Sequence, residues 1–487
     1  MKELKEQLAT ATLDATAQAE LVRRGEVAPG ELIDAAIARI ERTNPQLNAV
    51  ITPTFDKART QARSGTLPSG PFRGVPFLLK DLGAHSAGDP LHCGMRLLRD
   101  AGWVAPHDTY LAAKLRAAGF VFLGKTNTPE LGLLPTTEPE AHGATHNPWD
   151  VTRSPGGSSG GSGAAVAAGM VPAAHATDGG GSIRIPAAHC GLVGLKPSRG
   201  RVSFGPDAGE RWGGFSCENT VTRSVRDTAA ILDIVAGAMP GDPYVAPPPA
   251  RPFLAEVGAH PGRLRIGLMT TSPGGMPVHP ECVAAAAEGA RLLGDLGHTV
   301  EISHPEALRD YEATRAVVTV IACSTARTLD AWAEKLGRTI SASDVEPLTW
   351  SVADMGRQVS ACNYLRTVEF IHTQTRRLAS WWDGGFDLLL TPTAAEPPPK
   401  LGEFEPTPNN PFAGFLRAAV FSTFTSPFNL SGQPAISLPL HWSAEGLPIG
   451  VHLVAAYGRE DLLIRVAAQL EQAKPWASRR PPVHAGV

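Results

Sequence analysis

A run of three glycines followed by a serine has the composition of an acyl-transfer centre. Gly179, Gly180 and Gly181 precede Ser182 in the segment TDGGGSIRIP. Residues without a Cβ atom can aim successive backbone N–H groups into one cavity, where they would bind the negative oxygen that forms when a serine attacks a carbonyl carbon. The alternative is an ordinary glycine turn with a capping serine. The segment therefore suggests an oxyanion hole beside a serine nucleophile, which would still need a base from elsewhere in the chain.

Lys80 is the candidate base. The apolar run from Val75 to Leu79 leads directly into it, so we expect this lysine to enter the interior at the end of a strand. A lysine acts as a base near pH 7 only if its pKa falls by about 3 units, which costs roughly 4 kcal/mol. An apolar, water-poor site can impose that cost. The alternative is a lysine with a buried stem and a hydrated ammonium group.

Two more serines lie in GGSSGG, which matches the Gly-x-Ser-x-Gly pattern at both Ser158 and Ser159. A glycine-rich segment gives this match by composition alone, and the preceding PWDVTRSPG is typical of a turn, whereas a nucleophile elbow follows a strand. A serine–histidine–aspartate triad would need partners further along the chain, and Asp387 and His441 are available. On the residues alone this alternative stays open.

The segment GFVFLGKT, residues 119–126, matches the Gly-x-x-x-x-Gly-Lys-Thr pattern of a phosphate-binding loop. Such a loop needs small residues that let backbone N–H groups surround an anion. The four middle positions here are bulky and apolar, which is typical of a buried strand. We therefore expect a strand and no nucleotide site.

Composition narrows the classes of function. The 487 residues carry a net charge of -3, so the basic excess of a protein that binds nucleic acid or an anionic membrane is missing, and we expect a small-molecule substrate. The cysteines form no Cys-x-x-Cys pair and the histidines no His-Glu-x-x-His motif, so no metal and no cofactor are expected. No apolar run reaches the ~20 residues of a membrane span, and no secretion signal is recognisable, which predicts a cytoplasmic protein.

The elements that must position these residues alternate between helix and strand. The patterns predict a helix over 31–42, a strand over 74–82, a helix over 108–118 and a strand at 120–124. Residues 153–200 are rich in glycine, serine and alanine. A flexible linker would not contain AAVAAGMVPAAHA, which predicts a compact helix between two glycine loops.

The second half of the chain continues the alternation. Residues 263–304 predict a β-α-β unit with its helix over 280–296, and residues 305–385 predict mainly helix. The strand FDLLLTPT, two strands joined by a turn at 444–446 and a final amphipathic helix complete the pattern. The fold class is therefore expected to be α/β.

Together these motifs resemble the amidase signature family of serine amidohydrolases. The resemblance covers nearly the whole chain and rests on GVPFLLKDL, GKTNTPELG, PGGSSGGSGAAVAAG, TDGGGSIRIPAAHCGLVGLKPSRGRVS and FNLSGQPAISLPLHWSAEGLPIGVHLVAA. It implies the amidase signature fold, a large mixed β-sheet core flanked by helices on both faces. We expect one domain over 1–487, made up of an N-terminal helical segment (1–70), a signature core (71–240), a variable substrate-shaping region (241–390) and a C-terminal return to the core (391–487).

The resemblance also implies a Ser-cisSer-Lys triad. Lys80 matches the lysine of that triad, Ser158 the serine that follows a cis peptide bond, and Ser182 the nucleophile. The N–H groups of Gly179, Gly180, Gly181 and Ser182 would then form the oxyanion hole.

Three neighbouring residues are expected to support the triad. For Ser159 we expect hydrogen bonding around the catalytic groups, and for Asp178 and Arg184 we expect bracing of the nucleophile loop. Trp212, Cys323 and Phe412 are candidates for the wall of the substrate pocket, with ordinary core packing as the alternative.

The wording of the motifs is most similar to family members that hydrolyse cyclic oligoamides and to urethane-cleaving relatives. This implies cleavage of C–N bonds in amides, linear or cyclic, with carbamates as further candidate substrates. A glutaminase-type subunit of a tRNA-dependent amidotransferase is the alternative, and intact Lys80, Ser158 and Ser182 argue against a non-catalytic scaffold. We expect a monomer or a homodimer.

Overall fold

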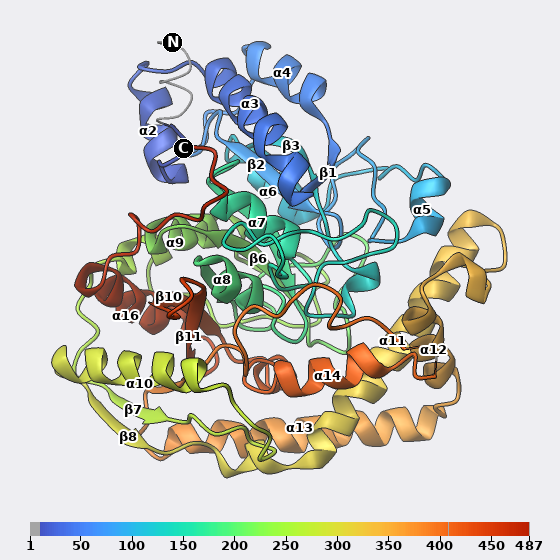
Figure 1. Cartoon of the computed structure of the whole chain (residues 1–487), viewed down its shortest axis with the longest axis vertical. Coiled ribbons are helices and arrows are strands. Elements are labelled where there is room, and N and C mark those ends of the chain that lie inside the picture. The colour runs from blue at the N-terminus through green and yellow to red at the C-terminus, as the bar shows by residue number, and fades with distance from the viewer. Residues whose placement is uncertain (1–9, 408, 487) are drawn as a thin grey trace.

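A computed structural model describes residues 10–407 and 409–486, and all structural statements below refer to these residues. Residues 1–9 of the expected N-terminal helical segment lie outside them. The described chain forms one mixed sheet of eleven strands in the order β1-β3-β2-β4-β6-β5-β10-β11-β9-β7-β8 (Figure 1). The strands are β1 (Val50–Pro53), β2 (Pro76–Lys80), β3 (Val121–Thr126), β4 (Ala173–Asp178), β5 (Val193–Lys196), β6 (Cys217–Thr222), β7 (Arg265–Leu268), β8 (Thr299–Ile302), β9 (Leu388–Pro392), β10 (Ala435–Trp442) and β11 (Pro448–Ala455).

The direction of the strands changes along the sheet. β3, β2 and β4 are parallel, β4, β6, β5, β10, β11 and β9 alternate in direction, and β9, β7 and β8 are parallel again. The predicted β-α-β unit is confirmed, because β7 and β8 pair in parallel and helix α10 (Pro280–Asp295) connects them.

Helices cover both faces of the sheet, as expected. On one face, α6 (Tyr110–Ala117), α9 (Val225–Val235), α10 and α16 (Glu460–Ala473) pack on a core that includes Phe77 and Leu79 of β2. On the other face, α3 (Pro29–Leu47), α4 (Phe55–Arg63) and α7 (Gly160–Ala167) pack on a core that includes Leu78. Side chains of a strand alternate between its two faces. Lys80, two residues after Leu78, therefore points toward the same face as Leu78, the face that α7 covers.

The expected helical region 305–385 consists of α11 (Tyr311–Leu336), α12 (Pro347–Arg357) and α13 (Ala361–Asp383), which lie along one margin of the molecule in yellow and orange (Figure 1). The remaining helices are shorter: α2 (Ala15–Arg23), α5 (Arg96–Asp100), α8 (Arg184–Cys190), α14 (Ala413–Phe421) and α15 (Pro427–Leu430). Within the described part of the chain, each helix is too short or too polar to span a bilayer.

Two predicted elements need correction. The predicted helix in AAVAAGMVPAAHA is only half right: α7 ends at Ala167, Gly169 follows with φ +73°, and β4 begins at Ala173. The alanines fit either structure, so the left-handed glycine decides where the helix ends. The helix predicted to end before Asn44-Pro45 continues to Leu47. Pro45 lies in its last turn, where the missing N–H of the proline removes one hydrogen bond of the helix. Strands β1, β5 and β6 were not predicted.

Candidate active site

Lys80 is the last residue of β2 and is completely buried. Its Nζ donates hydrogen bonds to Ser158 Oγ at 2.6 Å and to Thr177 Oγ1 at 2.8 Å. Burial lowers the pKa of Lys80 to about 7, although the charges of Asp178 and Glu218 act in the opposite direction. At neutral pH a large share of the molecules therefore carries a neutral amine that can accept a proton.

Ser158 follows Gly157 through a cis peptide bond, shortly before α7 begins. A side chain at residue 157 would not fit, since a Cβ atom there would lie 2.2 Å from the carbonyl oxygen of Thr136. Gly132 packs against Ser158 from the other side, where a Cβ atom would lie 3.1 Å from Ser158 Oγ. The serine is thus enclosed by backbone that only glycine permits, and its hydroxyl is left facing Lys80.

Ser159 holds two elements of the site together. Its Oγ donates to the carbonyl oxygen of Thr177 and accepts from the N–H of Thr177, both at 3.2 Å. These bonds join the start of α7 to the end of β4. Thr177 therefore contacts two site residues: its backbone bonds to Ser159, and its hydroxyl accepts from Lys80.

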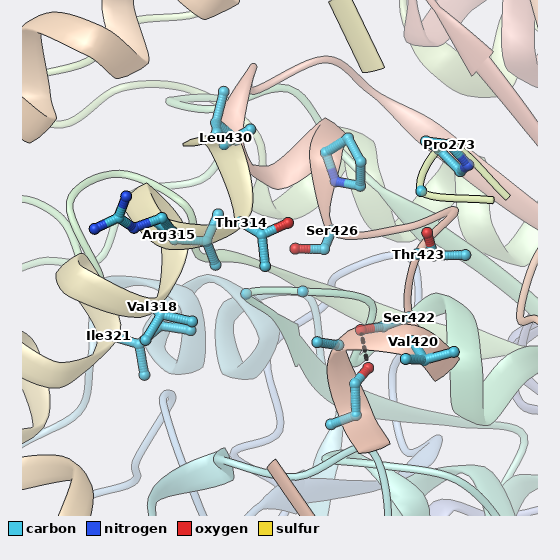
Figure 2. A pocket seen from close by; sticks show the side chains of 18 of the residues that line it. Pro273, Thr314, Arg315, Val318, Ile321, Val420, Ser422, Thr423, Ser426 and Leu430 are labelled. Carbon is cyan, nitrogen blue, oxygen red and sulfur yellow. Dashed lines mark hydrogen bonds between the residues drawn. The ribbon is translucent and has the colours of Figure 1, made fainter. Parts of the chain in front are cut away.

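Ser182 lies where two cavities meet. We call the first, of about 560 Å³, the apolar cavity, because carbon-rich side chains make up most of its wall. We call the second, of about 740 Å³, the polar cavity, because Ser158, Arg211 and Glu218 also line it. Figure 2 shows the apolar cavity; its labelled residues are Pro273, Thr314, Arg315, Val318, Ile321, Val420, Ser422, Thr423, Ser426 and Leu430.

Asp178 and Arg184 brace the loop that carries Ser182. Both side chains are fully buried, and two guanidinium nitrogens of Arg184 each donate to one carboxylate oxygen of Asp178 at 2.9 Å. The Arg184 guanidinium holds the pKa of Asp178 well below its usual range. The same carboxylate accepts from the N–H groups of Gly181 at 2.7 Å and Ile183 at 3.1 Å. The pair therefore fixes the backbone on both sides of the serine.

Two residues near the C-terminal end of the chain complete this brace. Thr425 Oγ1 donates to the carbonyl oxygen of Gly180 at 2.7 Å, and Asn429 Nδ2 donates to Asp178 Oδ1 at 2.8 Å. No motif in the sequence assigned a role to either residue. A threonine and an asparagine are too common for their types alone to mark a site.

The expected oxyanion hole needs one correction. Gly181 donates its N–H to Asp178, so this group is already used and does not face either cavity. Gly181 has φ +141°, and a Cβ atom there would lie 2.5 Å from Thr425 Oγ1, so its role is to let the loop turn. Within the described residues, the N–H groups of Gly179, Gly180 and Ser182 have no acceptor, and all three residues line the apolar cavity.

Glu218 is a site residue that the sequence did not indicate. It lies on β6 directly opposite Thr177 of β4 and is only 3% exposed. Among the described residues its carboxyl group has no hydrogen-bond donor, and His175 Nε2 lies 3.9 Å from Glu218 Oε2. Burial raises the pKa of Glu218 to about 7, while Arg211 and Lys80 act in the opposite direction. Glu218 lines the polar cavity together with Ser158, and a raised pKa in a cavity wall points to a role in the site.

The three predicted pocket residues have different outcomes. Trp212 lines both cavities, and Cys323 lines the polar cavity. Phe412 lines neither; it packs instead on a hydrophobic cluster to which α11, α12 and the segment 91–133 all contribute. Phe415, in the first turn of α14, lines the apolar cavity. The sequence interpretation therefore chose the wrong aromatic residue of this segment.

The serine–histidine–aspartate alternative does not assemble. His441 contacts Glu288 at 2.7 Å and Glu281 at 3.3 Å, both on α10. Asp387 accepts from the backbone N–H of Arg265 at 2.8 Å. Neither side chain reaches a serine of the GGSSGG segment.

The segment 119–126, which matches the pattern of a phosphate-binding loop, does not form such a loop. Val121–Thr126 is strand β3, as predicted, and Lys125 is buried within it rather than presented by a loop. Its Nζ donates to the carbonyl oxygen of Ala84 at 3.4 Å.

Comparisons with known proteins agree with this geometry. A family model for amidases matches residues 31–464. The 6-aminohexanoate-cyclic-dimer hydrolase of Pseudomonas sp. (strain NK87) is 48% identical over 476 residues, which cover 96% of this chain and 96% of that protein. The solved structure of a 6-aminohexanoate cyclic dimer hydrolase is 47% identical with a TM-score of 0.93, covering 97% of this chain and 99% of that one.

More distant relatives share the fold over a similar length. A bacterial aryl acylamidase of the amidase signature family is 30% identical with a TM-score of 0.86, covering 96% of this chain and 99% of that one. One component of the glutamyl-tRNA(Gln) amidotransferase of Thermotoga maritima is 27% identical with a TM-score of 0.76, covering 98% of each chain. Sequence and structure therefore lead to the same conclusion: this chain belongs to the amidase signature family and is a serine hydrolase that acts on amides.

Proposed function

We propose that this amidase hydrolyses uncharged amides, linear or cyclic, through a relay of Ser182, Ser158 and Lys80. The observation that carries the proposal is the 2.6 Å hydrogen bond between Lys80 Nζ and Ser158 Oγ in a fully buried setting. Ser158 and Ser182 line the same cavity, so the hydroxyl that contacts the lysine also faces the space in front of the second serine. A base, a hydroxyl that passes the proton and a nucleophile are the parts that acyl transfer requires.

The reaction follows from these positions. Neutral Lys80 takes a proton from Ser158 as Ser158 takes one from Ser182, and Ser182 Oγ attacks the carbonyl carbon of the substrate. The free N–H groups of Gly179, Gly180 and Ser182 bind the resulting oxyanion. The proton returns through Ser158 to the leaving nitrogen, which departs as an amine and leaves an acyl ester on Ser182. Water then attacks this ester by the same route, which releases the acid and restores neutral Lys80.

The cavities support the choice of substrate. The apolar cavity is large enough for a hydrocarbon chain or ring, and it meets the polar cavity at Ser182, so a substrate amide can lie with one side in each. The hydrolase from Pseudomonas sp. that shares 48% identity is named for a cyclic dimer of 6-aminohexanoate. We therefore propose cyclic and linear oligoamides as the main class and carbamates as a further class, since a carbamate offers the same carbonyl–nitrogen bond.

The glutaminase alternative has less support. The amidotransferase component is 27% identical, against 48% for the cyclic-dimer hydrolase. A stand-alone enzyme, monomeric or homodimeric and cytoplasmic, stays the prediction, as does the division of the single domain into four regions.

The test is Ser182-dependent release of amine from a panel of substrates. The purified full chain is incubated with 6-aminohexanoate cyclic dimer, an aliphatic p-nitroanilide, an aryl carbamate and glutamine. Ser182→Ala, Ser158→Ala and Lys80→Met are each expected to lose at least ~10⁴-fold in kcat/KM, because groups that act as a unit lose most of the rate when any one is removed. Ser426→Ala, a serine that lines the apolar cavity away from Lys80, serves as the matched control and should keep most activity.

Two outcomes would contradict the proposal. If Lys80→Met kept most of the activity while Ser182→Ala lost it, the lysine would not be the base. If the protein hydrolysed only glutamine, and only with added partner proteins, the glutaminase alternative would replace the stand-alone hydrolase. Circular dichroism spectra of each variant show whether the fold is kept.

A further inference from the structure

We propose that His85, His107 and Asp207 form a binding site for a divalent transition-metal ion such as Zn²⁺, separate from the Ser182 centre. One ligand atom from each residue lies within 4.8 Å of the other two. His85 Nε2 lies 3.2 Å from Asp207 Oδ2, and His107 Nε2 lies 2.9 Å from Asp207 Oδ1. The two imidazoles thus converge on one carboxylate.

The ligand set suits ions of the zinc type. Imidazole nitrogen together with carboxylate oxygen is a common donor set for Zn²⁺, Co²⁺ and Ni²⁺. Bonds of ~2.0–2.2 Å in a tetrahedral site place neighbouring ligand atoms about 3.3–3.5 Å apart. The contacts of 3.2 Å and 2.9 Å with Asp207 would therefore lengthen slightly, and bonds to the ion would replace the hydrogen bond between His107 and Asp207. Three protein ligands leave at least one position for water, and the partly exposed side chains of His107 and Asp207 leave room for it.

The buried member of the set is held in position. The side chain of His85 is 9% exposed, against 44% for His107. The His85 ring packs edge-on against the His107 ring, with the two ring centroids 5.4 Å apart. A buried ring has less freedom to rotate than an exposed one. His85 would therefore be the fixed ligand, and the other two would adjust to the ion by rotating their side chains.

A second cluster with similar residues lacks these features. Asp81, His92 and His142 also have ligand atoms within 4.8 Å of one another. However, the Asp81 carboxylate already accepts from the N–H groups of His92 at 2.9 Å and Gly94 at 3.2 Å. The rings of His92 and His142 stack at 22°, and His92 Nδ1 contacts His142 Nε2 at 3.3 Å. The two imidazole nitrogens can share a hydrogen bond with each other, and the Asp81 carboxylate already has two backbone donors, so we assign this cluster a structural role.

The proposed site would connect two loops that lead to the catalytic groups. His85 lies five residues after Lys80, and Asp207 lies five residues before Trp212, which lines both cavities. A bound ion would tie these loops together at a point outside the cavities. The chemistry at Ser182 does not need it, and its expected effect is on stability.

Co²⁺ and Zn²⁺ titration of the full chain after removal of metals tests the proposal. Tetrahedral Co²⁺ gives visible absorption bands, which report ligation directly and do not depend on enzyme activity. We expect saturable binding by the wild-type protein, at least ~10-fold weaker binding by His107→Ala, and unchanged binding by the control variant His142→Ala. We also expect Zn²⁺ to raise the Tm of the wild-type protein but not that of His107→Ala.

Each other outcome overturns the proposal. These outcomes are no binding by the wild-type protein, equal binding by His107→Ala, or an equal loss in His142→Ala. Asp207→Asn provides a second variant, which keeps the shape of the side chain but removes its charge, and it should weaken Co²⁺ binding in the same way. Because His107 is half exposed, its replacement should leave the fold and the basal amidase activity unchanged, and both are measured on the same samples.

Discussion

Thr177 and Glu218 lie directly opposite each other on β4 and β6, and Thr177 also accepts a hydrogen bond from Lys80. One threonine therefore separates the buried lysine from a buried carboxyl group across three neighbouring strands. When Lys80 takes up a proton, positive charge forms in an interior that has little water. A nearby carboxylate stabilises that charge, so Glu218 should influence how readily the lysine acts as a base.

The first prediction concerns the pH dependence of the wild-type enzyme. We expect kcat/KM for a neutral amide to rise as the pH rises through about 7, because the pKa of Lys80 is lowered to about 7 and only the neutral amine accepts a proton. Below that pH the lysine is mostly protonated. The measurement is the initial rate on a p-nitroanilide from pH 5 to about 9. Activity that is independent of pH over this range would contradict a lysine base.

The second prediction is that Glu218→Gln moves this rise in activity to lower pH. The carboxylate favours the protonated form of Lys80, so its removal should lower the pKa of the lysine further. The proton taken up during acylation is then less well stabilised, and the rate above the transition should fall. Asp330→Asn is the control, because Asp330 lines the same cavity but is paired with Arg357 at 3.0 Å. A rise in activity that stays in place or moves to higher pH in Glu218→Gln would rule out this role.

The third prediction is that Arg184→Met destabilises the protein by about 3–5 kcal/mol, because it leaves the carboxylate of Asp178 buried without its charge partner. Urea unfolding followed by circular dichroism gives the free energy of unfolding. Arg417→Met breaks two more exposed pairs, with Glu396 at 2.9 Å and with Glu403, and should cost only ~0–1 kcal/mol for each. Similar losses in the two variants would show that the buried pair is not a special brace.

The fourth prediction compares two neighbouring glycines of the nucleophile loop. Gly181→Ala should lose most activity and some stability, because φ is +141° and the new Cβ atom would meet Thr425 Oγ1 at 2.5 Å. Gly180→Ala should fold normally, since no atom lies within 4 Å of its Cβ position.

Kinetics and thermal unfolding of both variants give the comparison. Because residue 180 lines the apolar cavity, its alanine variant should mainly raise KM. A Gly181→Ala variant with normal activity and Tm would contradict the arrangement of the loop.

Much of the fold could be predicted from local patterns. Apolar runs that end in a charged residue, as at Lys80, and amphipathic helices such as α3 and α16 follow the periodicities that burial imposes on strands and helices. The resemblance to the amidase signature family located the candidate catalytic residues, because its glycine-rich motifs are long. No local pattern by itself would have joined Lys80 to serines 78 and 102 positions further along the chain.

The sequence failed where polar residues are buried around the site. Strand β6, with the sequence CENTVT, is fully buried although four of its six residues are polar, so it lacks the apolar signal of an interior strand. Glu218 was missed for that reason. Thr425 and Asn429 were missed because their partners lie about 250 residues away, and only the folded chain brings them together. The hydrogen bond from the Gly181 N–H to Asp178 likewise depends on the conformation of the loop and not on the types of its residues.

The brace that Thr425 and Asn429 provide also matters during synthesis. Lys80, Ser158 and Ser182 all leave the ribosome well before the part of the chain that carries these two residues. Until that part has folded back, the carbonyl oxygen of Gly180 and the carboxylate of Asp178 lack their contacts from residues 425 and 429. A growing polypeptide should therefore be unable to hydrolyse amides until residues 425–429 have been made and have folded back onto the loop.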